Sequence, residues 1–111
     1  MIRQRTARRS RYLTDMQISG IVLLTRHPVR LSGRCTSISE TGLGCYLSVS
    51  LSPGELIRLD LRLADTPIQT VAEIRYESDG HYGLEFIGLR WEKRDTIIRY
   101  CRRLPIKLEE E

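Results

Sequence analysis

Residues 57–63, Ile-Arg-Leu-Asp-Leu-Arg-Leu, hold the clearest pattern in this chain of 111 residues. Apolar side chains occupy every second position, and Arg58, Asp60 and Arg62 alternate with them. Successive side chains of a strand point to opposite faces, so this pattern predicts a half-buried antiparallel strand. The stretch therefore favours a mainly β fold.

Five more strands are expected around this one. The Asp79-Gly80 pair is typical of a tight hairpin, and alternation places Tyr76 on the same buried side as Ile74. Six short antiparallel strands favour a closed barrel, because closure leaves no exposed sheet edge. The five other strands are expected at residues 18–25, 29–38, 43–49, 68–77 and 82–86.

After the last of these strands, the spacing of the apolar residues changes from that of a strand to that of a helix. In residues 91–104, apolar side chains recur at i, i+3, i+4 and i+7, which predicts one face of an amphipathic helix. Pro105 is expected to end the helix. The apolar positions are Ile97, Tyr100, Cys101 and Leu104.

The chain divides into a basic arm (1–13), a barrel with its helix (14–104) and an acidic tail (105–111). Residues 1–11 contain five arginines and no acid, and the remaining chain has 13 basic and 14 acidic residues. We expect the arm to be flexible until a partner orders it. It suits a phosphate-bearing ligand, nucleic acid or anionic lipid, although a solvated tail would have the same composition.

Catalytic and metal-binding patterns are not found in the sequence. The three cysteines and two histidines show no spacing typical of a disulfide framework or a zinc site. No nucleophile–base pair is recognisable, so the chain is not expected to be an enzyme or to hold a metal or cofactor. Reduced cysteines, without a signal peptide or an apolar run of ~20 residues, predict a cytoplasmic protein that does not span a membrane.

Two short motifs indicate a binding function. Arg5-Thr-Ala-Arg-Arg9 has RxxxR spacing in the arm, and Ser37-Ile-Ser39-Glu-Thr-Gly42 lies where two strands should join. Serine hydroxyls bond phosphate, ribose or base edges, and glycine allows a ligand to approach the backbone or the chain to adopt positive φ. The second motif is equally compatible with a simple hairpin turn.

Together these motifs, in this order along a predicted barrel, resemble the PilZ domain, a bacterial receptor for cyclic di-GMP. The family signature is RxxxR followed by [D/N]x[S/A]xxG; Arg5 and Arg9 match the first part, and Ser39 and Gly42 match the second. Ser37 stands where the family has Asp or Asn. Residues 38–44 and 83–86 also resemble the family, and the resemblance extends from about residue 5 to residue 104.

The resemblance implies a six-stranded PilZ-like barrel with a C-terminal helix and with cyclic di-GMP as ligand. It implies that Arg5, Arg9, Ser37, Ser39 and Gly42 bind the ligand, with Arg8 and Arg11 contributing from the arm. Ligand binding would then order the arm and signal to an unidentified downstream protein that controls motility, biofilm or exopolysaccharide.

Two alternatives remain open at the level of sequence. Ser37 also fits a degenerate PilZ module that acts by protein contacts without a ligand. The basic arm and a small barrel also fit a nucleic-acid binder. Aromatic residues make up only 6% of the chain, and no outward aromatic pair is expected on a strand, so nucleic acid is the less favoured partner.

Overall fold

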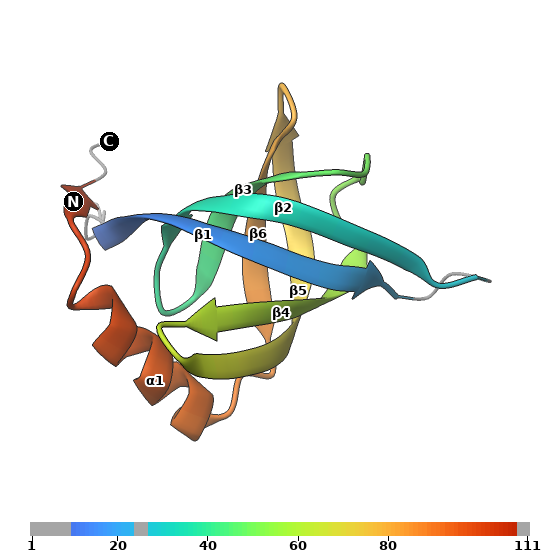
Figure 1. Cartoon of the computed structure of the whole chain (residues 1–111). Helices are drawn as coiled ribbons and strands as arrows, with labels where there is room; N and C mark the ends of the chain where they lie inside the picture. The colour runs from blue at the N-terminus through green and yellow to red at the C-terminus, as the bar shows by residue number, and fades with distance from the viewer. Residues whose placement is uncertain (1–9, 24–26, 109–111) are drawn as a thin grey trace, which may run out of the picture.

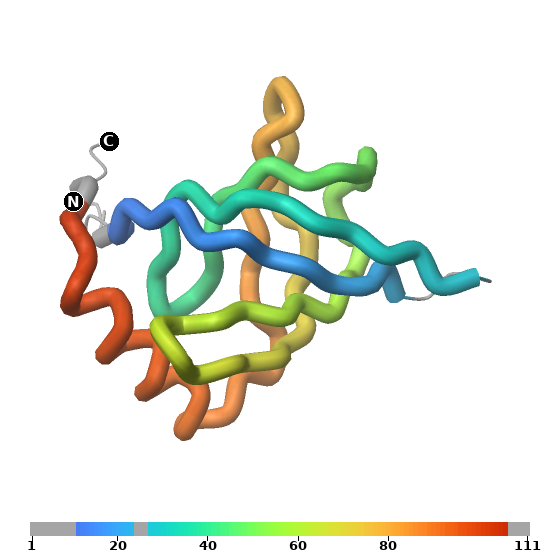
Figure 2. Tube along the Cα trace, viewed as in Figure 1, coloured from blue at the N-terminus to red at the C-terminus, as the bar shows by residue number. Residues whose placement is uncertain are grey.

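The structure is a computed structural model that describes residues 10–23 and 27–108. Six antiparallel strands pair in the cyclic order β1-β2-β3-β6-β5-β4 and close where β4 meets β1 (Figures 1 and 2). The expected six-stranded barrel is therefore confirmed. Its strands are β1 (Ser10–Val22), β2 (Val29–Ile38), β3 (Gly42–Leu47), β4 (Leu56–Leu63), β5 (Thr66–Ser78) and β6 (His81–Ile87).

The barrel core follows the alternation seen in the sequence. The apolar side chains at positions 57, 59, 61 and 63 of β4 point inward and are at most 2% exposed, while Arg58, Asp60 and Arg62 lie on the outer face. Burying a side chain of this size stabilises a fold by roughly 1.5–3 kcal/mol. All three cysteines are buried and unpaired, as expected of small core hydrophobes.

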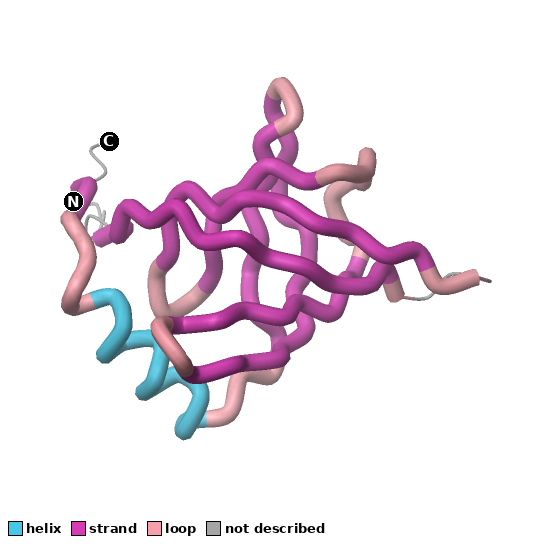
Figure 3. Tube along the Cα trace, viewed as in Figure 1, coloured by secondary structure: helices cyan, strands magenta, loops and turns pink. Residues whose placement is uncertain are grey.

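The helix α1 (Trp91–Cys101) covers the barrel end at which β2 and β4 finish (Figure 3). Ile97 and Cys101 are its buried residues, and Cys101 Sγ lies 4.0 Å from Ile38 O. The helix ends three residues earlier than predicted. Residues 102–104 form turns because the chain must become extended before Pro105, whose carbonyl accepts a hydrogen bond from Leu13 N at 2.8 Å.

Both borders of the predicted barrel differ from the sequence prediction. β1 begins at Ser10, so residues 10–13 belong to the barrel and not to the arm. Part of the predicted acidic tail is a strand, β7 (Ile106–Leu108), which pairs antiparallel with the start of β1. The two short segments satisfy each other's backbone hydrogen bonds, a pairing that charge patterns do not reveal.

Register irregularities change which face some residues occupy. In β5 an irregularity between Ile74 and Tyr76 leaves Arg75 as the extra residue, and Tyr76 pairs with Gly83. Tyr76 is consequently 43% exposed on the outer face, so its predicted burial is wrong. In β2 a similar irregularity between Cys35 and Ser37 places Ser37 opposite Gly44.

Candidate ligand-binding site

A hollow of about 350 Å³ lies on the outer barrel wall, beside the turn that joins β2 and β3. It brings together three of the predicted site residues, Arg11, Ser39 and Gly42. They come from β1, the turn and the first position of β3. The other lining residues are Thr41, Leu43, Arg75, Tyr76, Gly83, Leu84 and Glu85.

Arg11 is the arm arginine that the structure describes, and β1 positions it. The neighbouring Tyr12 pairs with Ile38, directly before the turn, so the chain enters the barrel beside residues 39–41. Arg5, Arg8 and Arg9 lie outside the described residues. The RxxxR motif itself cannot be placed, but Arg11 at the start of β1 lies beside the predicted ligand loop.

Hydrogen bonds within the turn 39–41 fix its shape. Ser39 N donates to Gly42 O at 2.8 Å, and Ser39 Oγ accepts from Thr41 N at 3.3 Å. The same hydroxyl lies 3.2 Å from Thr41 Oγ1. The turn interpretation of this motif is therefore correct, and the two hydroxyls that shape the turn also border the hollow.

One of the two reasons that the sequence indicated for Gly42, a positive φ, does not apply. Positive φ among the described glycines occurs at 54, 80 and 88, and not at Gly42. A Cβ on Gly42 would stand 2.0 Å from Leu84 O. Its missing side chain therefore permits close pairing of β3 with β6 and leaves the floor of the hollow as bare backbone.

Arg75 and Tyr76 also line the hollow, although neither was expected from the sequence to belong to the site. Both lie at the β5 irregularity, and the Tyr76 ring rests over Gly83, where a Cβ would come within 2.0 Å of the ring. Arg75 pairs with Glu85 at 3.0 Å and with Glu73 at 3.6 Å. The pairing of Tyr76 with Gly83 is the feature that could have indicated this arrangement. An aromatic ring can lie flat on a neighbouring strand only where that strand has a residue as small as glycine.

The hollow thus offers the groups that an anionic nucleotide requires. Arg11 and Arg75 supply two guanidinium groups, which bind phosphate or a guanine edge as planar forks. Tyr76 supplies an exposed ring on which a base can stack. Ser39 and Thr41 add hydroxyl groups.

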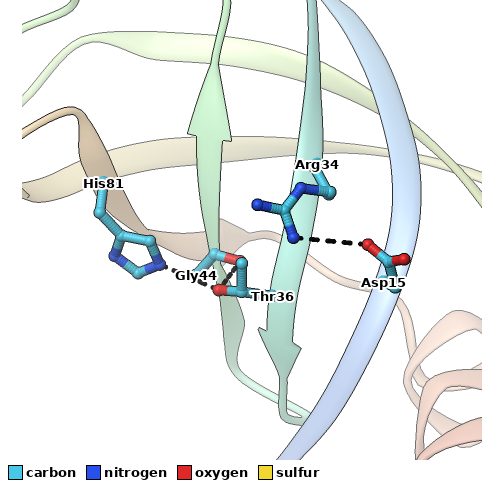
Figure 4. A network of polar contacts seen from close by, with 5 residues as sticks. All are labelled: Asp15, Arg34, Thr36, Gly44 and His81. Atoms are coloured by element: carbon cyan, nitrogen blue, oxygen red, sulfur yellow. Dashed lines mark hydrogen bonds and ion pairs between the residues drawn. The ribbon is translucent and has the colours of Figure 1, made fainter.

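Ser37 does not line this hollow and is only 8% exposed. Its Oγ lies over Gly44, where the ring of His81 also lies. His81 Nε2 is 2.9 Å from Thr36 Oγ1, and Arg34 on the same strand as Thr36 contacts Asp15 at 3.4 Å (Figure 4). This polar network covers the outer wall next to the hollow.

Tyr46 extends the same network. Its ring meets His81 edge-on with centroids 4.9 Å apart, and the Arg34 guanidinium lies 5.6 Å from the ring centroid. Tyr46 and Tyr76 are both more than 40% exposed on the outer face. They lie on different strands, β3 and β5, and the β5 irregularity is what turns Tyr76 outward.

The three buried cysteine thiols are held in their neutral, unreactive form. Burial raises the pKa of Cys35 and of Cys45 to about 12. The pKa of Cys101 is raised to about 11, mainly by burial and to a smaller extent by the negative charge of Glu40. A neutral buried thiol is a poor nucleophile. Within residues 10–23 and 27–108, no group of three or more His, Cys, Asp or Glu residues is arranged to hold a metal ion.

No helix in the described part of the chain is long and apolar enough to span a bilayer.

A family model described as the PilZ domain matches residues 3–103. The chain belongs to the PilZ domain family. No curated protein matches it. Solved PilZ structures agree in fold with this PilZ domain, at sequence identities that support the fold alone.

Three solved structures illustrate the agreement in fold. The PilZ domain of YcgR from Escherichia coli, solved with c-di-GMP, has a TM-score of 0.69 at 12% identity, covering 91% of this chain and 92% of that one. The PilZ domain of CeSA from a cellulose-synthesizing bacterium has a TM-score of 0.66 at 13% identity, covering 84% and 95%. The Bacillus subtilis inhibitor of motility, MotI/DgrA, has a TM-score of 0.68 at 22% identity, covering 90% of this chain but 51% of its own.

Proposed function

We propose that this PilZ domain is a cytoplasmic receptor for cyclic di-GMP and not a catalyst. The observation that carries the proposal is the hollow beside the β2–β3 turn, where Arg11, Ser39 and Gly42 meet Arg75 and Tyr76. Two guanidinium groups and an exposed ring suit a ligand with two phosphates and two guanines. The YcgR domain, which has the same fold, was solved with this ligand.

The arm arginines complete the proposed site. Arg5, Arg8 and Arg9 precede Arg11 by two to six residues, a chain length of about 7 to 22 Å when extended. Because Arg11 lines the hollow, a segment of that length is long enough to contact a ligand bound there. Arginine forks would then bind phosphate oxygens and the O6 and N7 atoms of guanine.

The energetics favour a switch. Fixing the backbone of each arm residue costs about 1–2 kcal/mol, and a hydrogen bond to a charged group returns about 1.5–3 kcal/mol. Several arginine contacts are therefore needed before the arm is ordered on the barrel. The ordered arm would form a new surface for a downstream protein, in keeping with the name of the MotI neighbour, an inhibitor of motility.

Calorimetric titration of cyclic di-GMP into the full chain tests the proposal. We expect saturable heat at micromolar protein, and weaker binding by Arg9→Ala. Arg62→Ala serves as a matched control, because Arg62 is exposed on β4 and does not line the hollow. An absence of heat from the natural chain would contradict the receptor function, and normal binding by Arg9→Ala would remove the role given to that residue.

A second candidate is a PilZ module that acts by protein contacts without ligand. The burial of Ser37 favours it, because a serine that is 8% exposed offers little to a ligand. A Ser37→Asp variant that binds cyclic di-GMP when the natural chain does not would establish this candidate. Equal binding by both proteins would exclude it.

A further inference from the structure

Another hollow, of about 260 Å³, lies on the outer wall of β4 and β5, beside the turn where the chain leaves β6 and enters α1 (Figure 1). Three cationic side chains line it: Arg58 on β4, Arg90 directly before α1, and Lys93 in the first turn of the helix. None of its lining residues in the described part of the chain is acidic. Lys93 Nζ donates to Gln69 O at 2.5 Å, and this neutral acceptor leaves the lysine charge uncompensated. We call this site the cationic hollow.

The two arginines of the cationic hollow have only weak ionic partners among the described residues. Arg58 Nη2 lies 3.5 Å from Asp60 Oδ2, and its buried Nε has no hydrogen-bond acceptor there. Arg90 Nε lies 3.8 Å from Glu92 Oε1, and more than half of each side chain is exposed. Exposed ion pairs of this length contribute little free energy. Both guanidinium groups are therefore available to an anion that a partner supplies.

Exposed apolar side chains lie beside these charges. Trp91, which directly follows Arg90, is 75% exposed, and Ile87, which lines the hollow, is 40% exposed. Tryptophan and arginine are the residues that most often carry the binding energy of protein interfaces. This combination is typical of a docking surface for a protein.

Charge complementarity indicates what occupies the surface. Three cations favour a segment with several carboxylates, and the exposed ring favours an apolar side chain in the same segment. Asp60 and Glu92 lie within 4 Å of the lining arginines, so they would repel the repeated phosphates of a bilayer or a nucleic acid. A protein segment can place its carboxylates in the hollow and other groups beside these two acids.

We propose that the cationic hollow and Trp91 form the docking surface for an acidic, partly apolar segment of the downstream protein. The inference rests on the proposed function, since it gives the chemistry of the partner to which the receptor signals. Val71 lines the cationic hollow and Arg75 lines the hollow beside the β2–β3 turn, a separation of about 13 Å along β5. A protein interface of ordinary size spans that distance, so one partner contacts both this surface and the arm that the ligand orders.

The fluorescence of Trp91 gives a direct readout, because it is the only tryptophan in the chain. The probe is the synthetic peptide Asp-Glu-Leu-Asp-Glu, and its neutral counterpart Asn-Gln-Leu-Asn-Gln is the control. We expect the acidic peptide to shift the emission to shorter wavelength, because its leucine shields the ring from water. The shift should saturate with a Kd of about 1 mM or tighter, and the neutral peptide should give no saturable shift.

Arg58→Gln and Arg62→Gln form a matched pair of variants. Both arginines lie on the outer face of β4, and of the two it is Arg58 that lines the cationic hollow. Arg58→Gln should weaken peptide binding about two- to fivefold, the loss expected for one exposed charge pair, and Arg62→Gln should bind as the natural chain does. Arg90→Gln should show the same loss as Arg58→Gln, and its exposed position makes misfolding an unsuitable explanation.

The outcomes separate this inference from the receptor function. No saturable shift with the acidic peptide, or equal binding by Arg58→Gln, Arg90→Gln and the natural chain, overturns the inference. A response only to phosphatidylglycerol vesicles, or only to a single-stranded oligonucleotide, assigns the surface to a membrane or to nucleic acid and also overturns it. These titrations contain no cyclic di-GMP, so their failure leaves the receptor function intact. An absence of heat when cyclic di-GMP is titrated overturns the receptor function, and the inference with it.

Discussion

Tyr76 is the residue whose position matters most to the proposed chemistry. Its ring rests on Gly83 and faces solvent, as a base-stacking platform requires. We predict that Tyr76→Ala weakens cyclic di-GMP binding by about 1–3 kcal/mol, or about 5- to 150-fold, because stacking is lost. Calorimetry provides the measurement.

Tyr76→Phe separates stacking from hydrogen bonding. Phenylalanine keeps the ring and loses the hydroxyl, so its affinity should stay within about threefold of the natural chain. If Phe and Ala weaken binding equally, the ring is not a stacking platform.

Arg11 is the second residue on which the site depends. Removing a hydrogen bond to a charged group costs about 1.5–3 kcal/mol, so Arg11→Ala should lower ligand affinity about ten- to hundredfold. The loss should shrink at high salt, since ionic strength screens exposed charges. Titrations at low and high salt measure both effects, and an Arg11→Ala variant with unchanged affinity would remove Arg11 from the site.

At the scale of elements, the contact between β3 and β6 sets the shape of the hollow. A Cβ on Gly42 would press on backbone, 2.0 Å from Leu84 O, so Gly42→Ala must force the two strands apart. We predict a loss of about 1–3 kcal/mol of folding free energy, or about 5–15 °C in melting temperature. Thermal unfolding monitored by circular dichroism measures it.

Gly83→Ala is the informative counterpart. Its Cβ would meet the outer end of the Tyr76 ring, 2.0 Å away, and that ring can swing outward. The expected result is a smaller loss of stability than in Gly42→Ala, together with weaker ligand binding. If Gly83→Ala is the more destabilising of the two, the ring is held more firmly than its exposure indicates.

The sequence predicted strands and helices well wherever one regular spacing of apolar residues runs through the whole element. Alternation in residues 57–63 was enough for β4, and the i, i+3, i+4 pattern was enough for most of α1. The alternating pattern gave the wrong face for Tyr76, because one extra residue in β5 moves its side chain from the inner to the outer face. The charged residues around Tyr76 are compatible with either register, so the sequence did not reveal the irregularity. Motif spacing pointed to three residues that line the hollow, Arg11, Ser39 and Gly42, and their role as ligand contacts stays a prediction. It could not point to Arg75 and Tyr76, because they reach the hollow through pairing between β5 and β6.

At the scale of the whole molecule, the closed barrel keeps three thiols in its interior. The folded protein holds these protons up to pH 11 or 12, whereas an exposed thiol loses its proton near pH 9. The unfolded state therefore binds fewer protons above pH 9, and we predict that the free energy of unfolding falls as pH rises from 9 toward 12. Denaturant titrations at a series of pH values measure the slope.

Cys45→Ala is the control for this effect, because it removes one titrating thiol from the core. Its stability should fall less steeply over the same pH range. Equal slopes in the natural chain and the variant would show that Cys45 ionises as readily folded as unfolded.

The central claim is that cyclic di-GMP binds at the outer hollow beside the β2–β3 turn. The most direct test is a titration of the full chain with cyclic di-GMP, followed by the backbone amide resonances in two-dimensional NMR. The largest shifts should cluster at Ser39–Gly42, Tyr76 and Gly83, with α1 nearly unchanged. Saturating ligand that leaves these amides unmoved, or that shifts mainly α1 and the β4–β5 turn, would contradict the claim.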